Sequence, residues 1–154
     1  MSAVEDRLAE LGLEVPPVAP PVAAYVPTAR SGELVWVSGQ LPVVDGSLLE
    51  KGKVGAEIDP EQAARLARRC ALNAIGALKA EVGDLDRIQR IVKVVGFVAS
   101  APGFHGQPGV VNGASELLVA AFGDAGRHAR SAVGVAVLPL DAPVEVELVA
   151  QVRG

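Results

Sequence analysis

The sequence has few of the residues from which disulfide, metal and stacking sites are built. Its 154 residues include one cysteine and two histidines, and aromatic residues make up only 3% of the chain. A single cysteine excludes a disulfide within the chain and is typical of a reducing compartment, so we expect a cytoplasmic location. Because large aromatic side chains are scarce, valine, alanine, leucine and isoleucine have to fill the core.

The sequence also lacks an excess of positive charge and long apolar runs. The formal net charge is −4 at pH 7, whereas sequence-independent binding of nucleic acid requires a basic surface. No apolar run approaches the roughly 20 residues of a transmembrane helix. Residues 1–15 are acidic and amphipathic, without the positively charged start and long apolar stretch of a signal peptide. We expect neither a nucleic-acid partner nor a membrane partner.

Motifs for metal binding and covalent catalysis are absent from the sequence. His105 and His128 have no Cys, Asp or Glu at ligand spacing, and we therefore expect no metal ion. Cys70 lies on the apolar face of a predicted helix, where a cysteine is typically a small packing residue. The chain has no G-x-S-x-G nucleophile motif and no glycine-rich phosphate loop. These absences exclude the function classes that depend on such motifs.

Apolar residues, in contrast, are abundant. They make up 50% of the chain, and the mean hydropathy is +0.35. A domain of this size buries about 68–70% of the surface that its unfolded chain exposes. A small chain this apolar often has surface left over that another subunit covers. We therefore expect a homo-oligomer.

The periodicity of apolar residues predicts an α+β domain. Asp59 is a good N-cap, Pro60 suits the first helical turn and Gly83 suits a helix end, so 60–82 is the clearest predicted helix. A second helix is predicted over 110–126, with its end at Gly123 or at Gly126. Strands are predicted over 33–44, 90–100, 130–138 and 143–152. Two helices among these strands would pack on one face of a mixed β-sheet, and the apolar opposite face would be buried between subunits.

The N-terminal part of the chain differs in composition from the rest. Residues 2–12 are predicted to form a short amphipathic helix. Five prolines within residues 16–27 then prevent a helix and indicate an extended connector. We interpret residues 1–24 as a helix with a Pro-rich extension that precedes a domain over 25–154. We expect this extension to lie over a neighbouring subunit.

Arg130 is a candidate binding residue because it stands at the start of a predicted apolar strand. From there its guanidinium group can reach a cleft, where its planar fork of N–H donors would match a carboxylate. The alternative is a structural ion pair with Glu145 or Glu147 on the following strand. The residues alone leave both possibilities open.

Glu145 and Glu147 share one face of the last predicted strand, whose other face is apolar. A carboxyl group beside an apolar wall can have a raised pKa and can hold or activate a water molecule. The alternative is a strand face that simply lies in solvent. The pattern favours neither.

Three segments resemble, in order and spacing, the signatures of the RidA/YjgF family, in a divergent branch close to the chorismate mutase-like proteins. Residues 25–46, YVPTARSGELVWVSGQLPVVDG, resemble its N-terminal signature, and residues 110–124, VVNGASELLVAAFGD, resemble its V-N-x-x-Y/S-x-x-F helix. Residues 129–150, ARSAVGVAVLPLDAPVEVELVA, resemble its C-terminal signature. The resemblance implies a chorismate mutase-like α+β fold that forms a homotrimer, with sheets in a barrel-like core and helices outside.

The resemblance also implies an activity. Active members hydrolyse reactive 2-imino or 2-enamino acids, such as 2-iminobutanoate and 2-iminopropanoate, to 2-keto acids and ammonia in clefts between subunits, without a cofactor. By motif position, Arg130 matches the arginine that binds the substrate carboxylate, and Glu145 matches the acid that positions the attacking water. Tyr25, Gly39 and Asn112 match residues that line the cleft.

The chain departs from the family pattern close to the matched arginine. Ala132 and Gly134 stand where many members have a cysteine and a glutamate, and Ser115 stands at the aromatic position of the helix signature. Because these changes reshape the pocket, binding of a small carboxylate or keto acid without turnover is the alternative to catalysis. Some relatives carry the label endoribonuclease or translation inhibitor, but the acidic charge of this chain argues against that activity.

Overall fold

Five strands form one mixed sheet in the order β1-β2-β7-β5-β6 in the computed structural model, which describes residues 1–18, 20 and 24–154. The strands are β1 (Thr28–Ser31), β2 (Leu34–Gln40), β5 (Ile88–Ala99), β6 (Ala129–Val135) and β7 (Val144–Val152). A two-stranded hairpin, β3 (Val43–Val44) and β4 (Ser47–Leu48), turns at Asp45-Gly46. β5 and β6 are parallel and the other neighbours in the sheet are antiparallel.

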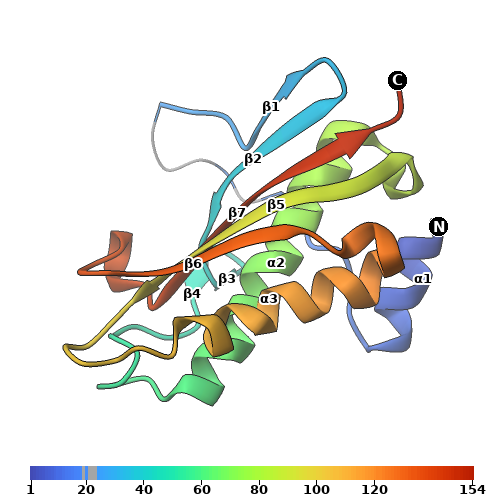
Figure 1. The fold of residues 1–154 in the computed structure, drawn as a ribbon. Coiled ribbons are helices and arrows are strands. Elements are labelled where there is room, and N and C mark those ends of the chain that lie inside the picture. Colours follow the sequence, from blue (N-terminus) through green and yellow to red (C-terminus); the bar gives the residue numbers. More distant parts are fainter. Residues whose placement is uncertain (19, 21–23) are drawn as a thin grey trace.

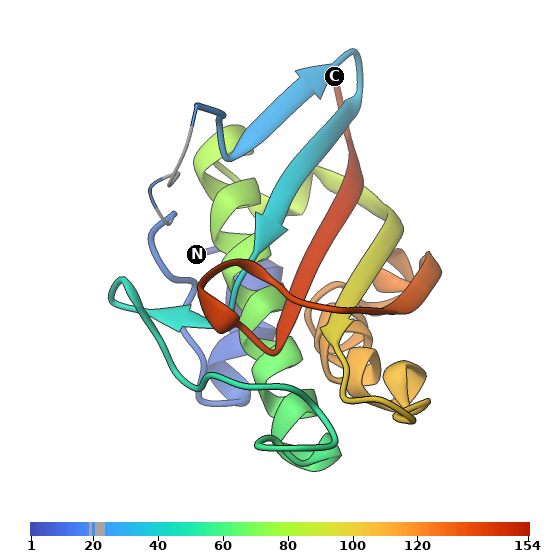
Figure 2. The same cartoon turned by 90° about the vertical axis from the view of Figure 1, so that its left-hand side faces the viewer.

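Two long helices, α2 (Pro60–Val82) and α3 (Gln107–Phe122), cover one face of this sheet, as Figures 1 and 2 show. The mixed α+β architecture with two helices on one face is therefore confirmed. Asp59 caps α2 by accepting a hydrogen bond from the Gln62 amide at 2.8 Å, and α2 ends at Gly83, as predicted. None of the described helices is long and apolar enough to cross a membrane.

The two faces of the sheet differ sharply, and β7 shows the difference best. Its residues Val144, Val146 and Leu148 are buried under the helices, whereas Glu145 and Glu147 between them point to the opposite face. No helix of the described residues covers that opposite face (Figure 2), and large apolar side chains are exposed on it. Trp36 and Val133, at 44% and 42% exposure, are examples.

The N-terminal helix α1 (Ala3–Glu10) packs against its own chain. Val4 and Leu8 are buried in the same hydrophobic core as α2 and α3. Arg7 donates a hydrogen bond to the Ala121 carbonyl at the end of α3, at 2.9 Å, and Glu5 forms an ion pair with Lys79. Leu11, directly after α1, is 47% exposed, and the contact of this segment with a neighbouring subunit stays a prediction. Residues 19 and 21–23 of the predicted connector lie outside the described residues.

Two details differ from the elements predicted. β1 was not predicted, because only its first residue, Thr28, is half-buried and the strand therefore lacks an alternating pattern. α3 begins at Gln107 rather than at 110, since Pro108 fits the first helical turn. Of the two predicted ends of α3, the structure shows Gly123, with φ +64°, and a separate short turn, η2 (Gly123–Gly126), follows.

Candidate functional site

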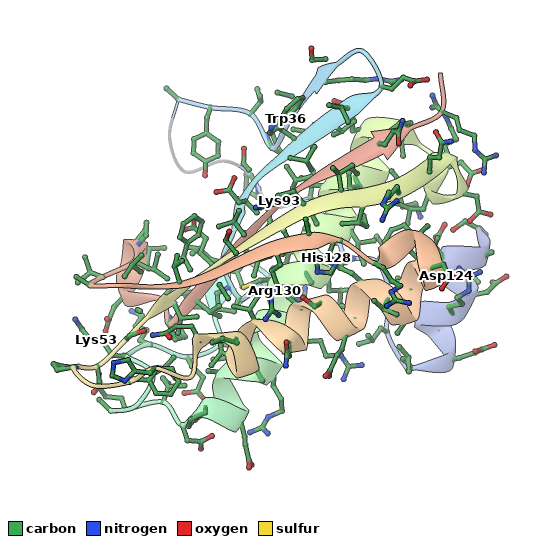
Figure 3. All side chains as sticks on the ribbon, viewed as in Figure 1. Trp36, Lys53, Lys93, Asp124, His128 and Arg130 are labelled. Carbon is green, nitrogen blue, oxygen red and sulfur yellow. The ribbon has the colours of Figure 1, made fainter. Side chains whose placement is uncertain are left out.

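Arg130 projects from the edge strand β6 toward α3. It lies opposite Val94 in the parallel ladder with β5, and Val94 is fully buried on the helix-covered face. Side chains of paired residues in neighbouring strands share a face, so the Arg130 side chain lies between β6 and α3, as Figure 3 shows. The site is thus built on the rim where the sheet ends and α3 begins.

α3 holds the guanidinium group of Arg130 with neutral acceptors. Nη1 donates to Asn112 Oδ1 at 2.7 Å and to Ser115 Oγ at 3.2 Å, and Nη2 donates to the Pro108 carbonyl at 3.3 Å. Asn112 and Ser115 reach the same group because residues three apart in a helix lie on one face. Three of the five guanidinium N–H donors are used in this way, which leaves donors for a ligand.

No carboxylate of the described residues neutralises Arg130. The one ion pair found among them joins Glu5 and Lys79, far from this site. The alternative of a structural ion pair with Glu145 or Glu147 is wrong, because β5 lies between β6 and β7 and both carboxylates point to the opposite face of the sheet. Arg130 therefore presents an uncompensated charge at the rim, a suitable partner for an external carboxylate.

His128 completes a polar chain behind Arg130. Its Nε2 lies 2.9 Å from Ser115 Oγ, and its Nδ1 lies 2.6 Å from the carbonyl oxygen of Gly126. Burial lowers the pKa of His128, the hydrogen bond with Gly126 opposes this effect, and the positive charge of Arg130 lowers the pKa further. A pocket of about 280 Å³ opens beside these groups and is lined by Ser115, Val119, Arg127, His128 and Arg130.

The residues that depart from the family pattern lie along the same side of β6. Ala132 and Gly134 alternate with outward residues and share the face of Arg130. A Cβ at Gly134 would lie 2.8 Å from Gln107 Nε2 and 3.1 Å from Ser100 Oγ. Gln107 Nε2 donates to that hydroxyl at 3.1 Å and to the Phe104 carbonyl at 2.8 Å. The space that a larger residue would take is thus filled by an amide–hydroxyl pair, which sequence reasoning missed.

Glu145 and Gly39 meet on the other face of the sheet. The ladder between β2 and β7 shifts register between Val37 and Gln40, and a Cβ at Gly39 would collide with the Glu145 carboxyl group. Gly39 is therefore required for this close approach. Burial raises the pKa of Glu145, and the neighbouring charge of Glu147 raises it further. The carboxyl group is half-buried, and a raised pKa makes its carboxylate form a stronger base.

The segment that carries Tyr25 is hydrogen-bonded to β2 beside Gly39. The carbonyl of the next residue, Val26, accepts a hydrogen bond from Ser38 Oγ at 2.6 Å, and Ser38 directly precedes Gly39. Tyr25 is 45% exposed. The five predicted site residues thus form two groups: Arg130 with Asn112, and Glu145 with Gly39 and the Tyr25 segment. Within one chain the sheet separates the two groups.

Other candidate groups supply no second site. Cys70 is buried, and burial raises the pKa of its thiol well above the ordinary value, so the reactive thiolate is disfavoured. No cluster of three or more His, Cys, Asp or Glu that could hold a metal ion occurs within residues 1–18, 20 and 24–154.

Comparisons with known proteins match nearly the whole chain. The profile of the family described as "YjgF/chorismate mutase-like, putative endoribonuclease" matches residues 5–152. "Protein TCP17" of Trypanosoma cruzi is 43% identical over 151 residues, which cover 97% of this chain and 94% of that protein. The crystal structure of a protein of unknown function from Agrobacterium tumefaciens is 45% identical, with a TM-score of 0.93 over 98% of this chain and 93% of that one. The crystal structure of a "putative endoribonuclease" from Shewanella oneidensis is 36% identical, with a TM-score of 0.94 over 97% of this chain and 99% of that one.

Proposed function

This chain belongs to the YjgF/chorismate mutase-like family, and from this premise we propose that it hydrolyses reactive 2-imino or 2-enamino acids to 2-keto acids and ammonia. The observation that carries the proposal is that Arg130 is held in place by hydrogen bonds but is not neutralised by an acidic residue. Its guanidinium group is oriented by three neutral acceptors of α3 and has no ion-pair partner among the described residues. A rigid, unpaired fork of this kind selects a ligand with a carboxylate.

The second half of the proposed site comes from another copy of the chain. Arg130 and Glu145 lie on opposite faces of the sheet, so one chain cannot direct both at the same small molecule. We propose a homotrimer in which the helix-free sheet faces meet in a barrel-like core. The exposed Trp36 and Val133 on that face support such a contact. Each cleft then contains Arg130 of one subunit and Glu145 of the next.

The proposed chemistry needs only these groups and a water molecule. Arg130 binds the substrate carboxylate and fixes the position of the adjacent imine carbon. Glu145, whose pKa is raised by burial, accepts a proton from water while the water oxygen bonds to the imine carbon. Protonation of the nitrogen of the resulting carbinolamine allows the C–N bond to break. Ammonia leaves, the carbonyl of the 2-keto acid forms, and the net reaction consumes one water.

Binding without turnover is a second candidate function. Ala132 and Gly134 favour it, because they leave no thiol or carboxyl group on β6 beside Arg130. In this case the protein would be a trimer that captures small carboxylates or keto acids. We do not propose the endoribonuclease activity that the names of some relatives suggest, since a net charge of −4 gives no general attraction to RNA.

The test is hydrolysis of 2-iminobutanoate that is generated enzymatically in the assay. The wild-type protein should accelerate the release of ammonia and 2-oxobutanoate, and Arg130→Ala should abolish the acceleration. Arg130→Lys is the matched control: it keeps the positive charge but loses the planar fork, so it should retain only part of the activity. A wild-type protein that binds 2-oxobutanoate in calorimetry without any acceleration would replace the hydrolase by the binding function.

A further inference from the structure

Three hydrogen bonds connect Arg130 to the backbone at Gly126 through two side chains that the proposed reaction does not use. Arg130 Nη1 donates to Ser115 Oγ, Ser115 Oγ lies 2.9 Å from His128 Nε2, and His128 Nδ1 lies 2.6 Å from the Gly126 carbonyl. Figure 3 shows His128 and Arg130 side by side between β6 and α3.

The chemistry of the donors and acceptors fixes the direction in which each of these three hydrogen bonds is donated. A carbonyl oxygen only accepts, so the short contact with Gly126 requires the proton of a neutral imidazole to be on Nδ1. His128 Nε2 is then an acceptor, and the single hydroxyl proton of Ser115 points to it. Both lone pairs of Ser115 Oγ are left for other donors, and Arg130 Nη1 takes one of them. A protonated imidazole would instead place a second cation and a second donor against Ser115.

The two partners of His128, Ser115 and Gly126, are both fixed to α3. Ser115 is a residue of α3 itself. Gly126 is buried so closely against the helix that a Cβ there would collide with the Leu118 carbonyl, and the backbone of η2 closes with a hydrogen bond from the Arg127 amide to Asp124. The imidazole is therefore fixed relative to the guanidinium group that it supports.

We infer that Ser115 and His128 are positioning residues, which hold the Arg130 guanidinium group in the orientation that binds a carboxylate. This inference rests on the proposed function, because it assumes that Arg130 binds the substrate. A serine beside a histidine can also form a nucleophile and base. Here Arg130 occupies a lone pair of Ser115 Oγ, which makes the hydroxyl a weaker nucleophile, and the geometry points to support rather than to covalent catalysis.

The test uses a matched pair of His128 variants. His128→Gln can place its Oε1 near the position of Nε2 and still accept from Ser115. His128→Asn can place its amide near Nδ1 and donate to Gly126, but it offers Ser115 no acceptor. The dissociation constant of 2-oxobutanoate is measured by calorimetry. We expect about a tenfold weaker binding for His128→Asn and for Ser115→Ala, and a change of less than about twofold for His128→Gln. Thermal unfolding and the oligomeric mass of each variant confirm that it is folded.

A spectroscopic measurement tests these three hydrogen bonds independently of ligand binding. In the ligand-free wild-type protein, long-range ¹H–¹⁵N spectra should show His128 as the neutral tautomer with its proton on Nδ1. His105→Gln identifies the signals of the other, exposed histidine, and Ser115→Ala should shift the Nε2 resonance of His128.

The two measurements separate the two claims. If wild-type protein binds 2-oxobutanoate and both Ser115→Ala and His128→Asn bind it as tightly, the inference is wrong while the proposed function stands. If the wild-type protein neither binds the keto acid nor hydrolyses the imine, the proposed function fails. The positioning role for a carboxylate then fails with it, and the tautomer tests only the arrangement of the hydrogen bonds: a proton on Nε2 overturns that arrangement, and a proton on Nδ1 agrees with it.

Discussion

Two inactive variants of this protein should restore each other's activity when their subunits are mixed. Arg130 and Glu145 lie on opposite faces of the sheet, so each proposed cleft takes its arginine from one subunit and its carboxylate from the next. Arg130→Ala retains an intact glutamate side and Glu145→Gln retains an intact arginine side. Neither variant alone can form a complete cleft, but a mixed trimer can.

The size of the recovery follows from this geometry. In an equimolar random mixture, half of the arginine sides and half of the glutamate sides are intact. About one quarter of the clefts should therefore be complete in a cyclic trimer. The two variants are co-refolded, and the release of 2-oxobutanoate is compared with that of wild-type protein at the same concentration.

A mixture with both defects on the same side is the control. Gly39→Val forces a side chain against the Glu145 carboxyl group, so mixing it with Glu145→Gln should give no recovery. If the Arg130→Ala and Glu145→Gln mixture is no more active than its parents, although mass spectrometry shows mixed trimers, the shared cleft is refuted.

Three further predictions concern pH and packing. Because burial raises the pKa of Glu145, kcat/KM should rise with pH through an inflection above the carboxyl group's ordinary 4.5, and Glu145→Gln should remove that inflection. Gly113→Ala places a Cβ into the Ala64 carbonyl of α2 and should lower the free energy of unfolding by about 2 kcal/mol. The control Gly109→Ala, whose Cβ meets nothing within 4 Å, should not destabilise the fold. Equal urea midpoints for the two variants would contradict this prediction. The hydrogen bond with Lys79 lowers the pKa of Glu5 from 4.5 to about 2. The contribution of Glu5 to stability is therefore present above pH 4.5 and is lost as the pH falls toward 2. Glu5→Gln should flatten the urea-midpoint profile between pH 4.5 and 2, and an unchanged profile would count against the ion pair.

The helices and most strands could be predicted because their signals are local. Asp59, Pro60 and Gly83 mark the ends of α2 by the chemistry of their own side chains and backbone, and the alternation along β7 reports burial on one face. The strand order was harder, because it depends on pairing between distant residues. A signal for it exists: strand, helix and strand in succession favour parallel neighbours, which places β6 beside β5 and not beside β7.

The candidate site was predicted only in its residue types. Arg130 and Asn112 were both candidates from their motifs, and the structure brings them into contact. The sequence could not show that the sheet separates them from Glu145. The supporting contacts of Ser115, His128 and Gln107 were missed. They depend on side-chain conformations and on the close packing of Gly126 against α3, for which no periodic pattern exists.

The central claim is that Arg130 binds the carboxylate of a small 2-keto or 2-imino acid in a cleft shared by two subunits. A crystal structure of the oligomer soaked with 2-oxobutanoate tests it most directly. We predict the ligand carboxylate paired side by side with the guanidinium group of Arg130, and the carboxyl group of Glu145 from a neighbouring subunit facing the carbonyl carbon. A ligand that binds elsewhere, or an Arg130 covered by a carboxylate of the protein itself, would contradict the account.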